Sequence, residues 1–141
     1  MSFTFLKTLP TPAEIRAQYP LSARGQQIKA AKDRDVRDVI TGASDKFLVI
    51  IGPCSADNED AVCDYVSRLA RVQEKVADRL VLVPRIYTYK PRTNGDGYKG
   101  LAYQPNPEEQ PDLAAGLVAI RRLQMRSIEE FGLPAADEML Y

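Results

Sequence analysis

The chain has 141 residues, of which 45% are hydrophobic and 27% are charged, and 19 basic residues balance 19 acidic residues. This composition is typical of a folded globular protein, and the zero net charge excludes a general positive field for nucleic acid or an anionic membrane. No apolar stretch reaches the roughly 20 residues of a membrane span and no signal-peptide pattern is present, so we expect a cytoplasmic protein without membrane or nucleic-acid partners.

Residues 1–44 predict an extension rather than part of the core. Pro10, Pro12 and Pro20 interrupt this segment, and its stretch from Ala23 to Ile40 is polar with sparse apolar positions. That pattern favours a surface helix ending near Gly42, because a deeply buried helix needs a fuller apolar stripe. We expect the helix to pack over one end of the core or against another subunit, and we assign residues 45–141 to the core domain.

The core begins with alternating strands and helices. Lys46 to Ile51 is a continuous apolar run, which predicts a strand buried on both faces. Asp57 or Asn58 can cap the following helix, and a second strand is expected from Leu80 to about Tyr87. The predicted helix carries its apolar side chains at three- and four-residue spacing: Ala61, Val62, Tyr65, Val66, Leu69, Val72 and Val76.

The second half of the core repeats this order. The segment from Lys90 to Pro111 is rich in Gly, Pro, Asn and Asp and is too long for a simple connection, which indicates a functional loop. Asp112 caps another amphipathic helix that ends at Gly132, and residues 134–140 predict a third strand. Strands alternating with helices indicate an α/β fold with a parallel sheet. Three strands alone would leave apolar edges unpaired, so we expect an incomplete fold.

Residues suited to anion binding gather at the predicted strand ends, where α/β folds bind their ligands. Arg85 continues a buried strand, so its charge needs either a ligand anion or a carboxylate partner. Lys90-Pro91-Arg92-Thr93 adds two cations and a hydroxyl within four positions. The set also includes Cys54 and Glu138. The leading hypothesis is an enzyme site for a phosphate or a carboxylate.

Simpler interpretations stay open for these residues. The Lys90 to Thr93 stretch is also compatible with an ordinary solvated loop. Cys54 is a candidate nucleophile or metal ligand, or else a small buried hydrophobe, and Cys63 is expected in the core. Glu138 can orient water, pair with Arg85 or point to solvent. The cysteine spacing predicts no disulfide, and the absence of histidine excludes catalytic Ser-His-Asp or Cys-His sets from this chain alone.

Four motifs, in this order and spacing, resemble type I 3-deoxy-D-arabino-heptulosonate 7-phosphate (DAHP) synthases. The motifs are Ile51-Gly52-Pro53-Cys54-Ser55, Arg85-Ile86-Tyr87 with Lys90-Pro91-Arg92-Thr93, Gly97-Tyr98-Lys99-Gly100-Leu101, and Gly132-Leu133-Pro134-Ala135-Ala136 followed by Glu138. The resemblance implies an eight-stranded (β/α)8 TIM barrel, of which this chain is the N-terminal part, ending in the third strand. It also implies an aldol-type condensation of phosphoenolpyruvate with erythrose 4-phosphate, the first step of the shikimate pathway to the aromatic amino acids.

The resemblance also implies roles for individual residues. Cys54 is expected to be one ligand of a divalent metal ion, which can be Mn, Fe, Co or Zn. Arg85 and Lys90 are expected to contact phosphoenolpyruvate in the catalytic site, with Glu138 acting nearby through water. Arg92 and Thr93 are expected to hold the phosphate of erythrose 4-phosphate. Family members also imply a homo-oligomer, feedback by an aromatic amino acid, and a subunit-contact or regulatory role for residues 1–44.

The chain departs from the family pattern in two ways. A barrel of this kind needs about 250 residues, and the family's remaining metal ligands include a histidine, which this chain lacks. We therefore expect the isolated chain to have no significant turnover. The alternatives are a 3-deoxy-octulosonate 8-phosphate synthase, which would have Asn in place of Pro91 and use arabinose 5-phosphate, and a non-catalytic regulatory or binding module.

Overall fold

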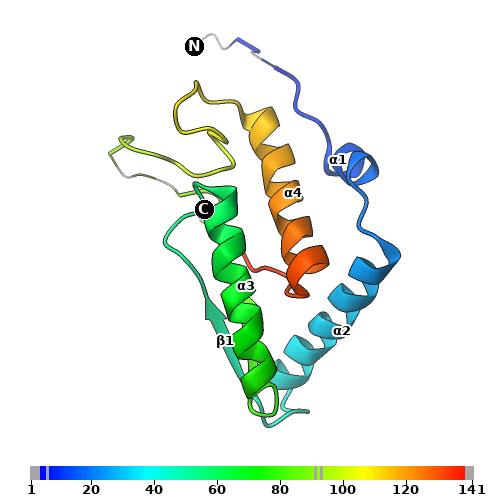
Figure 1. Cartoon of the computed structure of the whole chain (residues 1–141). Coiled ribbons are helices and arrows are strands. Elements are labelled where there is room, and N and C mark those ends of the chain that lie inside the picture. Colours follow the sequence, from blue (N-terminus) through cyan, green and yellow to red (C-terminus); the bar gives the residue numbers. More distant parts are fainter. Residues whose placement is uncertain (1–3, 6, 91, 93, 139–141) are drawn as a thin grey trace.

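Two parallel strands form the sheet of the computed structural model, which describes residues 4–5, 7–90, 92 and 94–138 (Figure 1). Strand β1 (Phe47–Ile51) pairs with β2 (Leu80–Pro84), from Phe47 opposite Leu80 to Ile51 opposite Pro84. Helix α3 (Glu59–Val76) connects them. The predicted parallel pairing across a helical crossover is confirmed.

Helices α3 and α4 (Leu113–Phe131) run side by side (Figure 1). Asn58, rather than Asp57, caps α3, while Asp112 caps α4 and Gly132 ends it in a left-handed conformation, as predicted. Their apolar stripes meet in the core, although Val72 lies outside it and is exposed. The buried core residues are Ala56, Val62, Cys63, Val66, Ile86, Leu101, Leu123 and Leu133.

The predicted third strand is reduced to a single parallel bridge between Arg85 and Ala136 in the described part of the chain. Ile86 N donates to Ala136 O at 2.8 Å, and Ala136 N donates to Pro84 O at 2.9 Å. The ladder does not continue, because the side chain of Asp137 accepts the N–H of Thr88 that the next bridge would use. Residues 139–141 of the predicted strand lie outside the described residues.

Two other strand predictions are wrong in detail. Strand β2 ends at Pro84 instead of Tyr87, because its partner β1 is followed by Gly52 and Pro53, and Pro53 has no N–H to donate. Strand β1 is not buried on both faces, since Phe47 is 69% exposed and Ile50 is 55% exposed. The physical reason is that, among the described elements, α3 packs mainly on β2 and α2 covers only part of β1.

The extension holds two helices, of which one was predicted. Helix α2 (Ala23–Ile40) lies on the surface and contacts α4 and β1, as expected for a sparse apolar pattern packed on the core. Sequence reasoning missed α1 (Pro12–Gln18), although Thr11 and Glu14 form a capping box and Pro12 occupies the first helical position. None of the helices in the described part of the chain has the length and apolar character for crossing a membrane.

Candidate active site

The candidate site lies where the carboxyl ends of β1 and β2 meet the long loop after β2. Figure 1 shows the arrow of β1 pointing toward the end of the molecule where α3 and α4 begin. The two exits approach closely at Gly52, where an added Cβ would lie 1.8 Å from Arg85 O. Since that distance is far below van der Waals contact, Gly52 is required for this packing of Cys54 and Arg85 at one rim.

Cys54 and Lys90 are in direct contact at this rim. Lys90 Nζ lies 2.8 Å from Cys54 Sγ, and the thiol is exposed. The hydrogen bond from Lys90 lowers the pKa of the Cys54 thiol, and the positive charges of Lys90, Arg85 and Arg92 contribute in the same direction. Cys54 is therefore an accessible, thiolate-prone side chain, and its interpretation as a small buried hydrophobe is wrong. That description fits Cys63, which is buried.

Arg85 is held by three groups. Its Nη1 pairs with Glu138 Oε1, and its Nη2 donates to Pro53 O at 2.7 Å. The guanidinium carbon also lies 5.2 Å from the centre of the Tyr87 ring, within cation–π range. The side chain of Arg85 remains 25% exposed. Glu138 is thus a partner of Arg85, and the guanidinium is fixed at the rim while still reachable from solvent.

Backbone pairing orders the loop that carries Lys90 and Arg92. Lys90 N donates to Lys99 O at 2.8 Å, and Ala102 N donates to Thr88 O at 2.9 Å. Arg92 Nε donates to Tyr98 O at 3.1 Å, which ties its side chain to the same loop. Pro91 and Thr93 lie outside the described residues, so the predicted role of Thr93 stays a prediction. The loop is therefore built to hold two cations near the strand exits.

The described residues do not form a metal centre by themselves. Within residues 4–5, 7–90, 92 and 94–138, no three His, Cys, Asp or Glu side chains cluster closely enough to hold a metal ion. Cys54 supplies one thiolate, whereas a zinc site, for example, uses three or four protein ligands. The site as described is a rim that carries three cations, Arg85, Lys90 and Arg92, and one candidate metal ligand.

One contact at the rim was missed by sequence reasoning. The carboxylate of Asp137 accepts hydrogen bonds from both the N–H and the hydroxyl of Thr88, which is 3% exposed. Asp137 directly precedes Glu138, but neither its spacing nor its residue type signals a contact with Thr88. Only the approach of residues 133–138 to the end of β2 brings the two side chains together.

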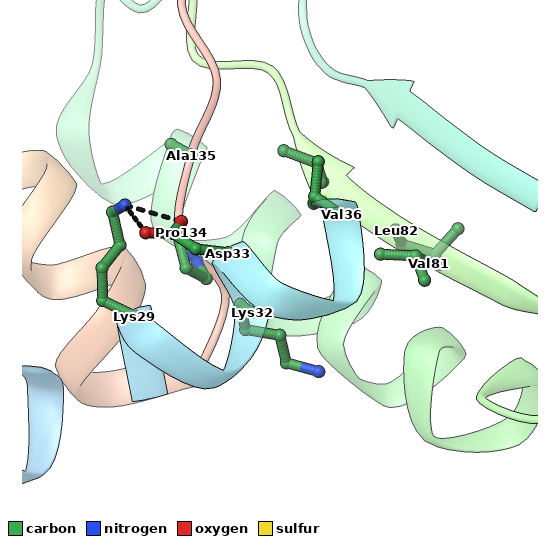
Figure 2. Close-up of a pocket in the computed structure, with 9 residues that line it drawn as sticks. Lys29, Lys32, Asp33, Val36, Val81, Leu82, Pro134 and Ala135 are labelled. Atoms are coloured by element: carbon green, nitrogen blue, oxygen red, sulfur yellow. Dashed lines mark hydrogen bonds and ion pairs between the residues drawn. The ribbon is translucent and has the colours of Figure 1, made fainter. Parts of the chain in front are cut away.

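A separate small cavity of about 90 Å³ lies between α2, β2 and residues 134–135 (Figure 2). Figure 2 shows Lys29 paired with Asp33 at one side and Val36, Val81 and Leu82 at the other. None of the rim residues Cys54, Arg85, Lys90 or Arg92 lines this cavity. It therefore does not belong to the candidate active site.

The curated relatives of this chain include several phospho-2-dehydro-3-deoxyheptonate aldolases. Phospho-2-dehydro-3-deoxyheptonate aldolase, Tyr-sensitive, from Escherichia coli is 35% identical over 134 residues, which are 95% of this chain and 37% of that protein. The phenylalanine-inhibited enzyme of Saccharomyces cerevisiae is 36% identical, over 94% of this chain and 35% of its own length. The chain thus spans little more than a third of these relatives.

The fold agrees with these relationships. A solved structure of phospho-2-dehydro-3-deoxyheptonate aldolase from Francisella tularensis superimposes with a TM-score of 0.89 at 26% identity, covering 99% of this chain and 40% of that one. The similarity supports a partial α/β barrel. The family model described as the DAHP synthetase I family matches residues 18–141. This chain therefore belongs to the DAHP synthetase I family, as its four motifs indicated.

Proposed function

We propose that the protein containing this chain condenses phosphoenolpyruvate with erythrose 4-phosphate, forming DAHP and releasing phosphate. The observation that carries this proposal is the contact between Lys90 Nζ and Cys54 Sγ, with the charges of Arg85 and Arg92 acting on the same thiol. Three cations around one rim suit two polyanionic substrates, because fixed positive charges offset the mutual repulsion of the phosphates. Membership of the DAHP synthetase I family supports the same reaction.

The proposed roles follow the geometry of the rim. Arg85 and Lys90 bind phosphoenolpyruvate, and Glu138 fixes Arg85 and orders water beside it. Arg92, and Thr93 outside the described residues, bind the phosphate of erythrose 4-phosphate. Arg92 suits this role because a guanidinium can bind a phosphate through two parallel hydrogen bonds.

Cys54 is the proposed ligand that this chain contributes to a divalent metal ion, which can be Mn, Fe, Co or Zn. A metal-bound cysteine is deprotonated, and Lys90 already favours the thiolate form of Cys54. When bound, a divalent metal supplies polarisation of a substrate oxygen. The remaining ligands come from outside the described residues, so we propose that the 141-residue chain alone does not turn over.

Regulation and assembly are proposed from the relatives. Two of them are named Tyr-sensitive and phenylalanine-inhibited. We propose that an aromatic amino acid inhibits this protein as well, and that it forms a homo-oligomer in which residues 1–44 contribute subunit contacts or regulation. The helices α1 and α2 of that segment lie on the surface of the described chain, where such contacts are available.

Phosphate release by the complete protein tests the proposed reaction. The assay supplies phosphoenolpyruvate and Mn²⁺ with either erythrose 4-phosphate or arabinose 5-phosphate. We expect release that depends on phosphoenolpyruvate and is faster with erythrose 4-phosphate. A preference for arabinose 5-phosphate would instead identify the octulosonate synthase reaction.

Two further arms separate the remaining possibilities. The isolated 141-residue chain should release no phosphate under the same conditions, and release would refute its proposed inactivity. The regulatory module would be favoured over the enzyme by two results together. The complete protein would lack turnover, and Phe, Tyr or Trp would raise the temperature of the chain's cooperative thermal transition.

A further inference from the structure

The carboxylate of Asp137 joins the segment after α4 to the segment after β2. Its Oδ1 accepts from Thr88 N at 3.1 Å, and its Oδ2 accepts from Thr88 Oγ1. Thr88 is buried, so both of its polar donors depend on partners within the protein. Hydrogen bonds to an ionised carboxylate are about twice as strong as those between neutral groups. Asp137 is therefore a firm anchor for Thr88.

Thr88 is in turn linked to the loop that presents Lys90. Thr88 O accepts from Ala102 N at 2.9 Å, and Lys90 N donates to Lys99 O two residues later. Gly100 lies against this turn of chain, since an added Cβ there would lie 2.3 Å from Thr88 O. Because Thr88 and Lys90 are held by the same short pairing, the position of Thr88 constrains the backbone from which Lys90 extends.

Asp137 also acts on the other cation. Its Oδ1 accepts from Glu138 N at 2.8 Å, which fixes the residue whose side chain pairs with Arg85. The preceding residue, Ala136, is already bridged to Arg85 by backbone pairing. One carboxylate thus connects the supports of Arg85 and Lys90, the two groups proposed to bind phosphoenolpyruvate.

We propose that Asp137 is a positioning residue that sets the placement of Arg85 and Lys90 for phosphoenolpyruvate by bridging Thr88 and Glu138. This inference rests on the proposed function. It adds to that function a residue that does not contact the substrate. Asp137 acts instead through Arg85 and Lys90, the two residues proposed to bind phosphoenolpyruvate. It also explains why the strand pairing stops at Ala136: the carboxylate takes the Thr88 and Glu138 N–H groups that continued pairing would use.

Steady-state kinetics of the complete protein tests this role. We expect Asp137→Ala to raise the KM for phosphoenolpyruvate about tenfold, since losing charge-assisted hydrogen bonds costs about a decade in affinity. The KM for erythrose 4-phosphate should change less than about twofold, because Arg92 is tied to Tyr98 O instead. Asp64→Ala is the matched control: it removes an exposed carboxylate that pairs with Arg68 on α3, and it should leave both KM values unchanged.

Three further variants separate positioning from a loss of folding. Thr88→Val keeps the N–H donor and removes the hydroxyl, so its KM for phosphoenolpyruvate should lie between those of wild type and Asp137→Ala. Asp137→Asn keeps one acceptor oxygen and should give similar partial rescue. Asp137→Ala combined with Thr88→Val should be no worse than Asp137→Ala alone, because both changes act on one contact.

The outcomes distinguish a failure of this inference from a failure of the proposed function. Wild-type turnover together with an unchanged phosphoenolpyruvate KM in Asp137→Ala overturns the positioning role alone. Equal increases in both KM values, or additive effects of the two substitutions, overturn it too. Absence of turnover in the wild type overturns the proposed function and this role with it.

Discussion

At the scale of single residues, the contact between Cys54 and Lys90 decides the chemistry of the rim. A thiol beside an ammonium group is a different reagent from an isolated thiol, because the positive charge stabilises the thiolate. Lys90 and, more weakly, the charges of Arg85 and Arg92 lower the pKa of Cys54. The pKa of Cys63 is shifted in the opposite direction by burial. The two cysteines therefore differ in reactivity.

The Lys90→Met variant tests this electrostatic link. Lys90 holds the pKa of Cys54 below its ordinary value, so the wild-type thiolate persists to lower pH. Removing the ammonium group should raise that pKa and move the pH profile of alkylation by iodoacetamide upward, with a severalfold slower rate at neutral pH. The rates are measured in metal-free buffer, and the site of alkylation is confirmed by mass spectrometry.

Lys75→Met is the control for this measurement, since Lys75 is an exposed cation in the last turn of α3. Its alkylation profile should match that of the wild type. A Lys90→Met profile that also matches the wild type would show that Lys90 does not set the reactivity of Cys54.

The sequence predicted which residues lie at the rim, but it did not predict the residues that hold them in place. Cys54, Arg85 and Lys90 could be placed together because each follows an apolar run, and the ends of parallel strands meet at one edge. Asp137 and Thr88 could not be paired in this way. Their contact depends on where the segment after α4 stops pairing with the residues after β2. No local sequence pattern indicates that position.

At the scale of elements, one carboxylate on α4 is among the groups that fix the extension to the core, together with Arg121, which donates to Tyr19 O. Glu129 accepts from Ser22 N at 2.9 Å and from Ser22 Oγ at 2.7 Å, at the residue that caps α2. An added Cβ at Gly25 would lie 2.5 Å from Glu129 Oε1, so α2 approaches α4 closely here. The hydrogen bonds from Ser22 lower the pKa of Glu129.

This lowered pKa predicts the pH dependence of α2 docking. A carboxylate with a depressed folded-state pKa contributes stability above its unfolded pKa, and that stability is lost as the pH falls through the folded pKa. Amide hydrogen exchange at Ser22 should therefore lose protection under acidic conditions. In Glu129→Gln, protection should already be reduced at neutral pH and should change little on acidification.

Glu74→Gln provides the comparison, because Glu74 is an exposed carboxylate on α3. It should show the wild-type pH dependence at Ser22. Protection that responds to pH equally in wild type and in Glu129→Gln would assign the docking of α2 to other contacts.

Elements with both a cap and an apolar stripe were the predictable ones. Asn58 and Asp112 begin α3 and α4, and Gly132 ends α4, at or next to the expected positions. The short helix α1 lacks a full apolar stripe, so the available signals were its capping box and Pro12 at its first position. The end of β2 depends on where its partner β1 stops, which is tertiary information.

At the scale of the whole molecule, β1 carries exposed apolar side chains and has one partner strand among the described residues. Phe47, Ile50 and Ile51 are large apolar side chains with 69%, 55% and 45% exposure. Exposed apolar strand edges favour association with further strands. We predict that the isolated 141-residue chain self-associates through β1.

Sedimentation velocity of the isolated chain checks this expectation. Ile50→Lys should reduce self-association, because a charge on an open strand opposes edge pairing. Val72→Lys is the matched control, since Val72 is 47% exposed but lies on α3. Equal association of both variants and the wild type would place the contact elsewhere.

The central claim is that Lys90 and its neighbours form one site for a phosphorylated substrate. Calorimetric titration of phosphoenolpyruvate into the complete protein tests it most directly, with wild type, Lys90→Met and the Lys75→Met control compared at one salt concentration. The account predicts clear binding to wild type and Lys75→Met, and an affinity at least about tenfold weaker in Lys90→Met. Equal affinity in all three proteins would contradict it.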